Sequence, residues 1–170
     1  EEAERAAGAC VSGVLIASPA NPTGAVHSRQ AIAELDAWCA DRGVAFISDE
    51  IYHGLTWSGE ETTALSVSDN AVVINSFSKY FCMTGWRIGW MVLPVDLVRP
   101  VECLAQSLYI SAPELSQIAA EAALDGIAEM EAVRAGYQKN RALLAERLPA
   151  LDLPFAAPMD GAFYAWMDVS

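Results

Sequence analysis

Three short apolar segments of this chain each end directly in a cluster of polar residues, and this order constrains the fold more than any other feature. The apolar segments cover residues 11–17, 44–47 and 71–74, and the polar clusters cover residues 19–24, 48–52 and 75–79. Short apolar runs without alternation are typical of strands in a sheet that is covered on both faces. In open α/β sheets, ligands bind at the carboxyl edge of such strands. The sequence therefore predicts an α/β fold with a ligand site built from the three clusters.

Helices are expected between and after these strands. Ser28 is a favourable N-cap residue, apolar residues then recur at helical spacing, and Gly43 suits the end of the helix. Residues 53–63 are polar and contain glycine, which predicts a loop. A fourth strand is expected at residues 88–93.

From residue 95 onward the pattern is helical. One helix is expected to open at Pro113 and run to Gly126, and a second covers roughly residues 127–148. Residues 161–167 are apolar and aromatic and predict a further strand.

Composition excludes several classes of partner. Hydrophobic residues make up 54% of the chain and charged residues 19%, which indicates a packed core and not a disordered chain. The net charge of -12 disfavours nucleic acid and anionic lipid as partners. No apolar run approaches the roughly 20 residues that span a bilayer. Many cytoplasmic proteins are acidic, and a cytoplasmic protein is what we expect here.

The four cysteines predict neither disulfides nor a zinc site. Cys10, Cys39, Cys82 and Cys103 form no C-x-x-C pair, and each lies among apolar neighbours. We expect all four to be reduced core residues. The chain begins Glu1-Glu2 without an initiator methionine and stops soon after a predicted strand, which leads us to expect a segment of a longer polypeptide.

Four motifs follow one another along the chain. They are N-P-T-G at residues 21–24, S-D-E-I-Y at 48–52, S-F-S-K at 76–79 and T-G-W-R-I-G at 84–89. Each motif alone is common in proteins, but the four in this order resemble the aminotransferase class I and II family. These are the fold-type-I pyridoxal-phosphate enzymes typified by aspartate aminotransferase. The resemblance extends from Val11 to about Met167.

The resemblance implies how the chain is divided. Residues 1–126 are expected to be part of the large domain that binds pyridoxal phosphate, a mostly parallel sheet between helices. Residues 127–170 are expected to hold the interdomain helix and the start of a small α+β domain. Chains of the family are more than twice as long. They carry a phosphate loop and a ring-stacking aromatic before this region and a carboxylate-binding arginine after it, so we expect this segment alone to be inactive.

The resemblance assigns the central chemistry to Lys79 and Asp49. Lys79 would form the imine with pyridoxal phosphate, an amine function that depends on a lowered pKa. A lone lysine in such a loop would otherwise be interpreted as a solubilising surface residue. Asp49 would keep the ring nitrogen of the cofactor protonated by charge pairing. Without the resemblance, Asp49 would be interpreted as a residue at the end of a strand that caps a turn. Glu50 follows it on the opposite face of the strand and is expected to have no catalytic role.

The remaining contacts to the cofactor are also implied by the resemblance. Asn21 and Tyr52 would hydrogen-bond its phenolate oxygen, although each also suits a turn or a core position. Ser76, Ser78 and Arg87 would hold the phosphate, since a guanidinium pairs with phosphate oxygens bidentately. The glycines that flank Arg87 suggest close backbone approach there. His53 is expected to be a solvated loop residue.

Three functions are compatible with this set of residues. The leading hypothesis is an aminotransferase that moves an amino group from an L-amino acid to a 2-oxo acid, as a homodimer. A relative that eliminates across a C–S bond would use the same cofactor residues. A pyridoxal-phosphate-binding sensor domain of a transcription regulator would also carry them, but the complete motifs favour the enzyme.

Overall fold

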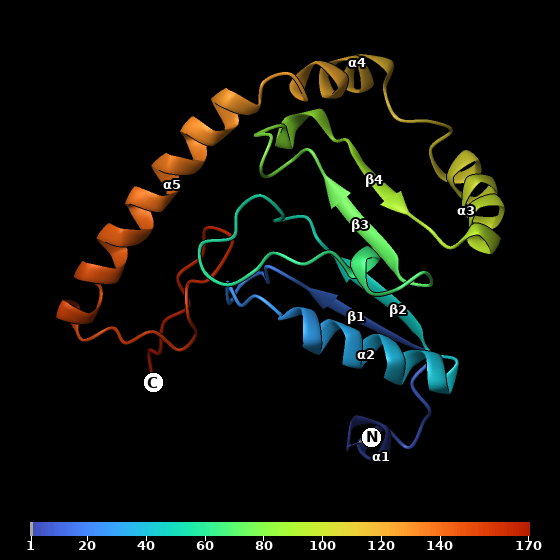
Figure 1. The fold of residues 1–170 in the computed structure, drawn as a ribbon, viewed down its shortest axis with the longest axis horizontal. Helices are drawn as coiled ribbons and strands as arrows, with labels where there is room; N and C mark the ends of the chain where they lie inside the picture. Colours follow the sequence, from blue (N-terminus) through green and yellow to red (C-terminus); the bar gives the residue numbers. More distant parts are fainter. Residues whose placement is uncertain (1) are drawn as a thin grey trace.

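The computed structural model describes residues 2–170 and contains a four-stranded sheet with the strand order β1-β2-β3-β4 (Figure 1). Strands β1, β2 and β3 are mutually parallel, and β4 runs antiparallel to β3. The carboxyl ends of the three parallel strands therefore meet at one edge, as the sequence predicts. The strands are β1 (Gly13–Ala17), β2 (Ala45–Asp49), β3 (Val72–Ser76) and β4 (Gly89–Val92).

Helix α2 (Arg29–Arg42) packs on one face of the sheet and forms the main core with it. Ser28 caps the helix, since its hydroxyl accepts a hydrogen bond from the Ala31 amide at 3.2 Å. Gly43 ends it with a φ of 63°, a conformation that favours glycine. Both predicted helix ends are confirmed. The buried core residues are Ile32, Cys39, Phe46, Ala64, Ala71 and Val73.

Three helices then follow one another around the outside of the sheet, from β4 to the C-terminal segment (Figure 1). They are α3 (Val95–Leu108), α4 (Glu114–Ala123) and α5 (Ile127–Arg147). The remaining helices are α1 (Glu2–Ala7) and the short 3-10 turns Ala64–Ser66, Thr84–Trp86 and Pro149–Leu151.

The sheet is less covered at β4 than the apolar strand pattern predicts. All four residues of β4 are exposed, with Met91 at 47%. None of the residues of α3 is buried either, although the helix is strongly amphipathic. Apolar surface is thus open along β4 and α3.

The strand predicted at residues 161–167 is wrong. Only two isolated bridges occur in this region, Thr56 with Gly161 and Phe155 with Met167. The reason is that neighbouring amides donate to different loops: Gly161 N donates to Gly24 O and Ala162 N to Leu55 O, both at 2.8 Å. No continuous ladder forms. The segment instead packs tightly against the loop after β1, where a Cβ on Gly161 would lie 2.5 Å from Pro19 Cβ.

The cysteine prediction is confirmed in one respect and wrong in another. All four thiols are free, but only Cys39 is buried, while Cys10, Cys82 and Cys103 are exposed. Apolar neighbours in sequence did not imply burial because Cys103 lies on α3, whose faces are open. Among residues 2–170, no helix combines the length and the apolar character needed to cross a bilayer.

Candidate active site

Lys79 lies in the turn after β3, and its amine lies beside a pair of aromatic rings that contact each other. Its Nζ is 5.3 Å from the centre of the Tyr52 ring and 5.7 Å from the centre of the Phe163 ring. The side chain is half-buried. Cation–π attraction to both rings fixes where the amine lies. The lysine is thus held at the carboxyl edge of the sheet and does not extend freely into solvent.

Tyr52 is buried, and its hydroxyl forms a hydrogen bond with the hydroxyl of Tyr164. Burial raises the pKa of Tyr52 far above its ordinary value, and the hydrogen bond to Tyr164 and the negative charge of Asp49 act in the same direction. Tyr52 therefore remains a neutral phenol that is able to donate a hydrogen bond. Asp49 precedes Tyr52 by three residues, at the same end of β2.

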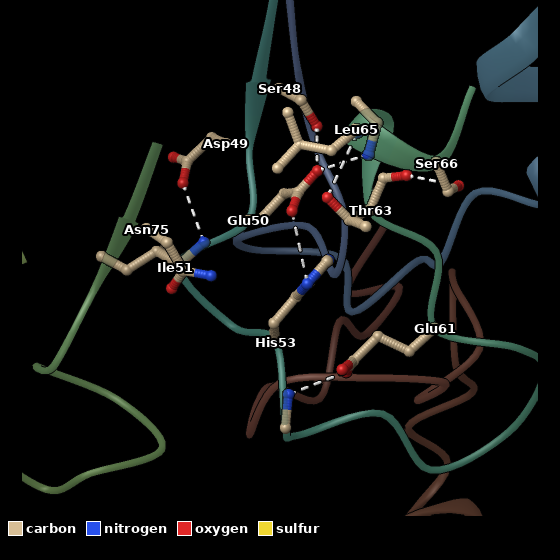
Figure 2. Close-up of polar contacts among 12 residues, drawn as sticks. Ser48, Asp49, Glu50, Ile51, His53, Glu61, Thr63, Leu65, Ser66 and Asn75 are labelled. Carbon is tan, nitrogen blue, oxygen red and sulfur yellow. Dashed lines mark hydrogen bonds and ion pairs between the residues drawn. The ribbon is translucent and has the colours of Figure 1, made fainter. Parts of the chain in front are cut away.

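Asp49 is the last residue of β2, with parallel partners on both sides at Ala17 and Ile74. Its Oδ1 accepts a hydrogen bond from the Ile51 amide at 3.1 Å (Figure 2). No residue of the described chain donates a hydrogen bond to its Oδ2. The carboxylate is therefore fixed by one oxygen and keeps acceptor capacity for a further group.

Glu50 lies on the other side of the strand end, where its side chain is buried (Figure 2). Its Oε1 accepts hydrogen bonds from Ser48 Oγ at 3.0 Å and from the Ala64 amide at 2.7 Å. Its Oε2 lies 3.4 Å from Nδ1 of His53. The prediction of a solvated His53 is wrong, because the ring lies against the Glu50 carboxylate and its side chain is only 16% exposed.

We expect Glu50→Ala to lower the free energy of unfolding by about 3 kcal/mol, because it leaves buried donors of Ser48 and Ala64 unpaired. Urea unfolding of the cofactor-free, full-length protein measures this. Glu61→Ala is the matched control, since Glu61 also accepts two hydrogen bonds, from Gly54 N and Thr56 Oγ1, but at the surface. A loss from Glu50→Ala no larger than that of the control would contradict the role of Glu50.

Ser76, Ser78 and Arg87 line one cavity of about 370 Å³. Ser76 Oγ lies 2.9 Å from Ser78 Oγ and accepts a hydrogen bond from the Ser78 amide at 3.0 Å. Arg87 has a φ of 52° and donates from Nη1 to its own turn, at Thr84 O, at 2.7 Å. Two hydroxyls and a guanidinium beside one hollow fit a phosphate group.

Gly89 lets this cavity form, whereas Gly85 does not contribute in the same way. A Cβ on Gly89 would lie 2.6 Å from the carbonyl oxygen of Asn75, so β3 and β4 approach too closely for a side chain. A Cβ on Gly85 would meet nothing within 4 Å. The expected close backbone approach is confirmed at Gly89 and wrong at Gly85.

Asn21 lies in the turn after β1, at the same edge of the sheet. The turn is closed by the Gly24 amide, which donates to Ala20 O at 2.8 Å. The side chain of Asn21 is exposed and has no hydrogen-bond partner among residues 2–170. The structure brings Lys79 and Tyr52 together, groups the two serines with Arg87 and places Asp49 at the end of β2 on the same edge of the sheet. It gives Asn21 no direct contact with these residues.

Phe163 and Tyr164 were not expected in the site. They come from the C-terminal segment and contact Lys79 and Tyr52. Sequence reasoning recognised the G-A-F-Y stretch only as the start of another domain. Neither spacing nor periodicity links that stretch to Lys79, since the contact is made by the path of the chain through α5.

Comparisons with known proteins identify the family of the chain. The family model for aminotransferase class I and II matches residues 1–170. The chain is 48% identical to the valine–pyruvate aminotransferase of Mycobacterium tuberculosis, over 93% of this chain and 42% of that protein. It is 38% identical to the arginine–pyruvate transaminase of Pseudomonas aeruginosa, over 89% of this chain and 40% of that protein.

Solved structures show the same fold. An aminotransferase from Mycobacterium tuberculosis superposes with a TM-score of 0.89 at 48% identity, over 93% of this chain and 42% of that one. A variant of Thermus thermophilus aspartate aminotransferase gives 0.88 at 33% identity, over 94% and 45%. The chain spans less than half the length of these relatives. Because the family model covers the whole chain, the chain belongs to the aminotransferase class I and II family.

Proposed function

We propose that the full-length protein is a pyridoxal-phosphate-dependent aminotransferase that moves an amino group from an L-amino acid to a 2-oxo acid. One observation carries this proposal: the Lys79 amine lies beside the rings of Tyr52 and Phe163, and the preceding residue, Ser78, lines the same cavity as Arg87. A cofactor that carries both an aldehyde and a phosphate needs an amine and a phosphate-binding group in one site. The names of the relatives as aminotransferases support the same conclusion.

The donor set fits the cofactor at each of its polar groups. Ser76, Ser78 and Arg87 would hold the phosphate. Asp49, with one oxygen open to a further donor, would pair with the protonated ring nitrogen. The neutral phenol of Tyr52 would donate to the phenolate oxygen, as would the amide of Asn21. When bound, pyridoxal phosphate supplies an electron-withdrawing ring that acidifies the α-carbon of an amino acid and stores its amino group.

The residues of this chain then handle protons and orientation. Lys79 acts as general base at the α-carbon of the substrate and returns the proton as general acid. The rings of Tyr52 and Phe163 restrict the directions in which its amine points. Tyr164 holds the Tyr52 hydroxyl in place. The carboxylate of Asp49 would stabilise positive charge on the ring of the cofactor.

We further propose that residues 1–126 belong to the large domain and that residues 127–170 hold the interdomain helix and the start of the small domain. The course of α5, which leads from the sheet to the C-terminal segment, supports this division (Figure 1). The proposal includes a cytoplasmic homodimer in the full-length protein and inactivity of this segment alone. The exposed apolar side chains of β4 and α3 support packing against further protein.

Product analysis tests the reaction type. With an L-amino acid and pyruvate, we expect the full-length protein to form alanine and the matching 2-oxo acid in equal amounts. Ammonia and pyruvate released without any oxo-acid acceptor would instead indicate elimination. If the protein binds the cofactor but turns over neither set of substrates, the enzyme proposal is overturned in favour of a sensor role.

A further inference from the structure

Tyr80, the residue after Lys79, forms a hydrogen bond with helix α5. The hydroxyl of Tyr80 donates a hydrogen bond to Glu131 Oε1 at 2.7 Å. The other oxygen of Glu131 is paired with Nη1 of Arg134 at 3.1 Å, and Nη2 of Arg134 donates to Thr56 O at 3.1 Å. This series of contacts, here called the Tyr80 network, connects the turn after β3 with α5 and with the loop after β2.

The ring of Tyr80 has little freedom to leave this network. It lies against Gly54, where a Cβ would be only 2.4 Å from Tyr80 Cδ2, and it makes an edge-on contact with Phe81 at 5.1 Å. Burial and the hydrogen bond to Glu131 raise the pKa of Tyr80 to about 12, so the phenol remains a donor at any working pH. The same hydrogen bond, together with Arg134, lowers the pKa of Glu131 and keeps it an acceptor.

The two sides of Lys79 are thus anchored separately. On the preceding side, the Ser78 amide donates to Ser76 Oγ at 3.0 Å, and Ser78 O accepts from Thr84 Oγ1 at 2.7 Å. On the following side, the side-chain anchor is the contact of Tyr80 with Glu131. Lys79 lies between these anchors, so its backbone direction depends on both.

We propose that the Tyr80 network positions Lys79, with Tyr80 and Glu131 as positioning residues that transmit the location of α5 to the lysine. Neither residue touches the reacting atoms. The network fixes the backbone of Lys79, and the rings of Tyr52 and Phe163 fix the position of its amine. This inference rests on the proposed function, since it assigns Lys79 the role of carrying the cofactor.

The test is the rate at which Lys79 captures the cofactor in the full-length protein. Cofactor-free protein is mixed with pyridoxal phosphate, and the rise of the visible absorption band of the lysine-bound cofactor is followed by stopped flow. We expect Tyr80→Phe and Glu131→Ala each to slow this rise at least fivefold. Glu131→Gln keeps an oxygen that accepts the Tyr80 hydrogen bond, and we expect its rate within twofold of wild type.

Glu146→Ala is the matched control, because it removes a carboxylate from an exposed position on the same helix. We expect it to leave the rate unchanged. Thermal unfolding of each cofactor-free variant is measured in parallel, since a merely structural role would lower the midpoint and leave the capture rate at 20 °C unaltered. The double variant Tyr80→Phe with Glu131→Ala is expected to be no slower than Glu131→Ala alone, because that single variant already breaks the hydrogen bond between Tyr80 and Glu131.

The outcomes separate this inference from the proposed function. Absence of the band in the wild-type protein would overturn the proposed function and the inference together. A normal band that forms at the wild-type rate in Tyr80→Phe and Glu131→Ala would overturn the positioning role alone. A Glu131→Gln variant as slow as Glu131→Ala would also overturn it, because the hydrogen bond from Tyr80 would then not be the contact that matters.

Discussion

Replacing Lys79 with alanine is expected to abolish the visible band of the bound cofactor and to lower kcat by at least about 10⁴-fold. The variant loses the amine that lies beside the rings of Tyr52 and Phe163, and with it the general base, which alone contributes roughly 10²–10⁴-fold. The fold is expected to be kept, since Lys79 is half-buried and its side chain makes no hydrogen bond to any residue of the described chain.

Lys139 offers a matched control, since it is the one other lysine of this sequence and lies exposed on α5. Lys139→Ala should keep both the band and the activity. Borohydride treatment of the wild-type protein, followed by peptide mapping, should leave the cofactor covalently attached at Lys79. Attachment at another lysine, or a normal band in Lys79→Ala, would show that the wrong residue has been assigned.

The sheet and the ends of α2 could be predicted because local chemistry decides them. Ser28 and Gly43 act through their own backbone neighbours, and the apolar runs of β1 to β3 need only a covered sheet. The edge at which polar clusters gather then follows from parallel pairing. The polar clusters that contain Lys79, Asp49 and Tyr52 are therefore predictable from the sequence as parts of one edge of the sheet.

The contributions of the C-terminal segment could not be predicted, because they depend on long-range packing. Residues 161–167 have the composition of a strand, but their amides are used by two different loops. Phe163 and Tyr164 reach the site only because that segment is folded back against the loops after β1 and β2. The contact between Glu50 and His53 could not be predicted for the same reason. The Glu50 carboxylate is also held by the amide of Ala64, which lies in a 3-10 turn fourteen residues further along the chain.

Asp49→Asn is expected to lower kcat by roughly a hundredfold or more while changing the stability of the cofactor-free protein by less than about 1 kcal/mol. Asparagine has nearly the same shape, and its amide oxygen is able to keep the hydrogen bond from Ile51 N. What disappears is the negative charge next to Tyr52 that would hold a proton on the ring nitrogen of the cofactor. Steady-state kinetics and urea unfolding of the same preparations measure the two quantities.

Glu50→Gln makes this prediction specific, because it removes the same charge one residue away on the opposite side of the strand end (Figure 2). The glutamine oxygen remains able to accept from Ser48 and Ala64, but the carboxylate oxygen that lies beside His53 Nδ1 is replaced by an amide nitrogen. We expect its main effect on stability, with kcat within about threefold of wild type. Equal losses of kcat in Asp49→Asn and Glu50→Gln would mean that negative charge at this edge acts without regard to position. A loss confined to Asp49→Asn would instead assign the ring-nitrogen contact to one carboxylate, held by one backbone amide at the end of β2.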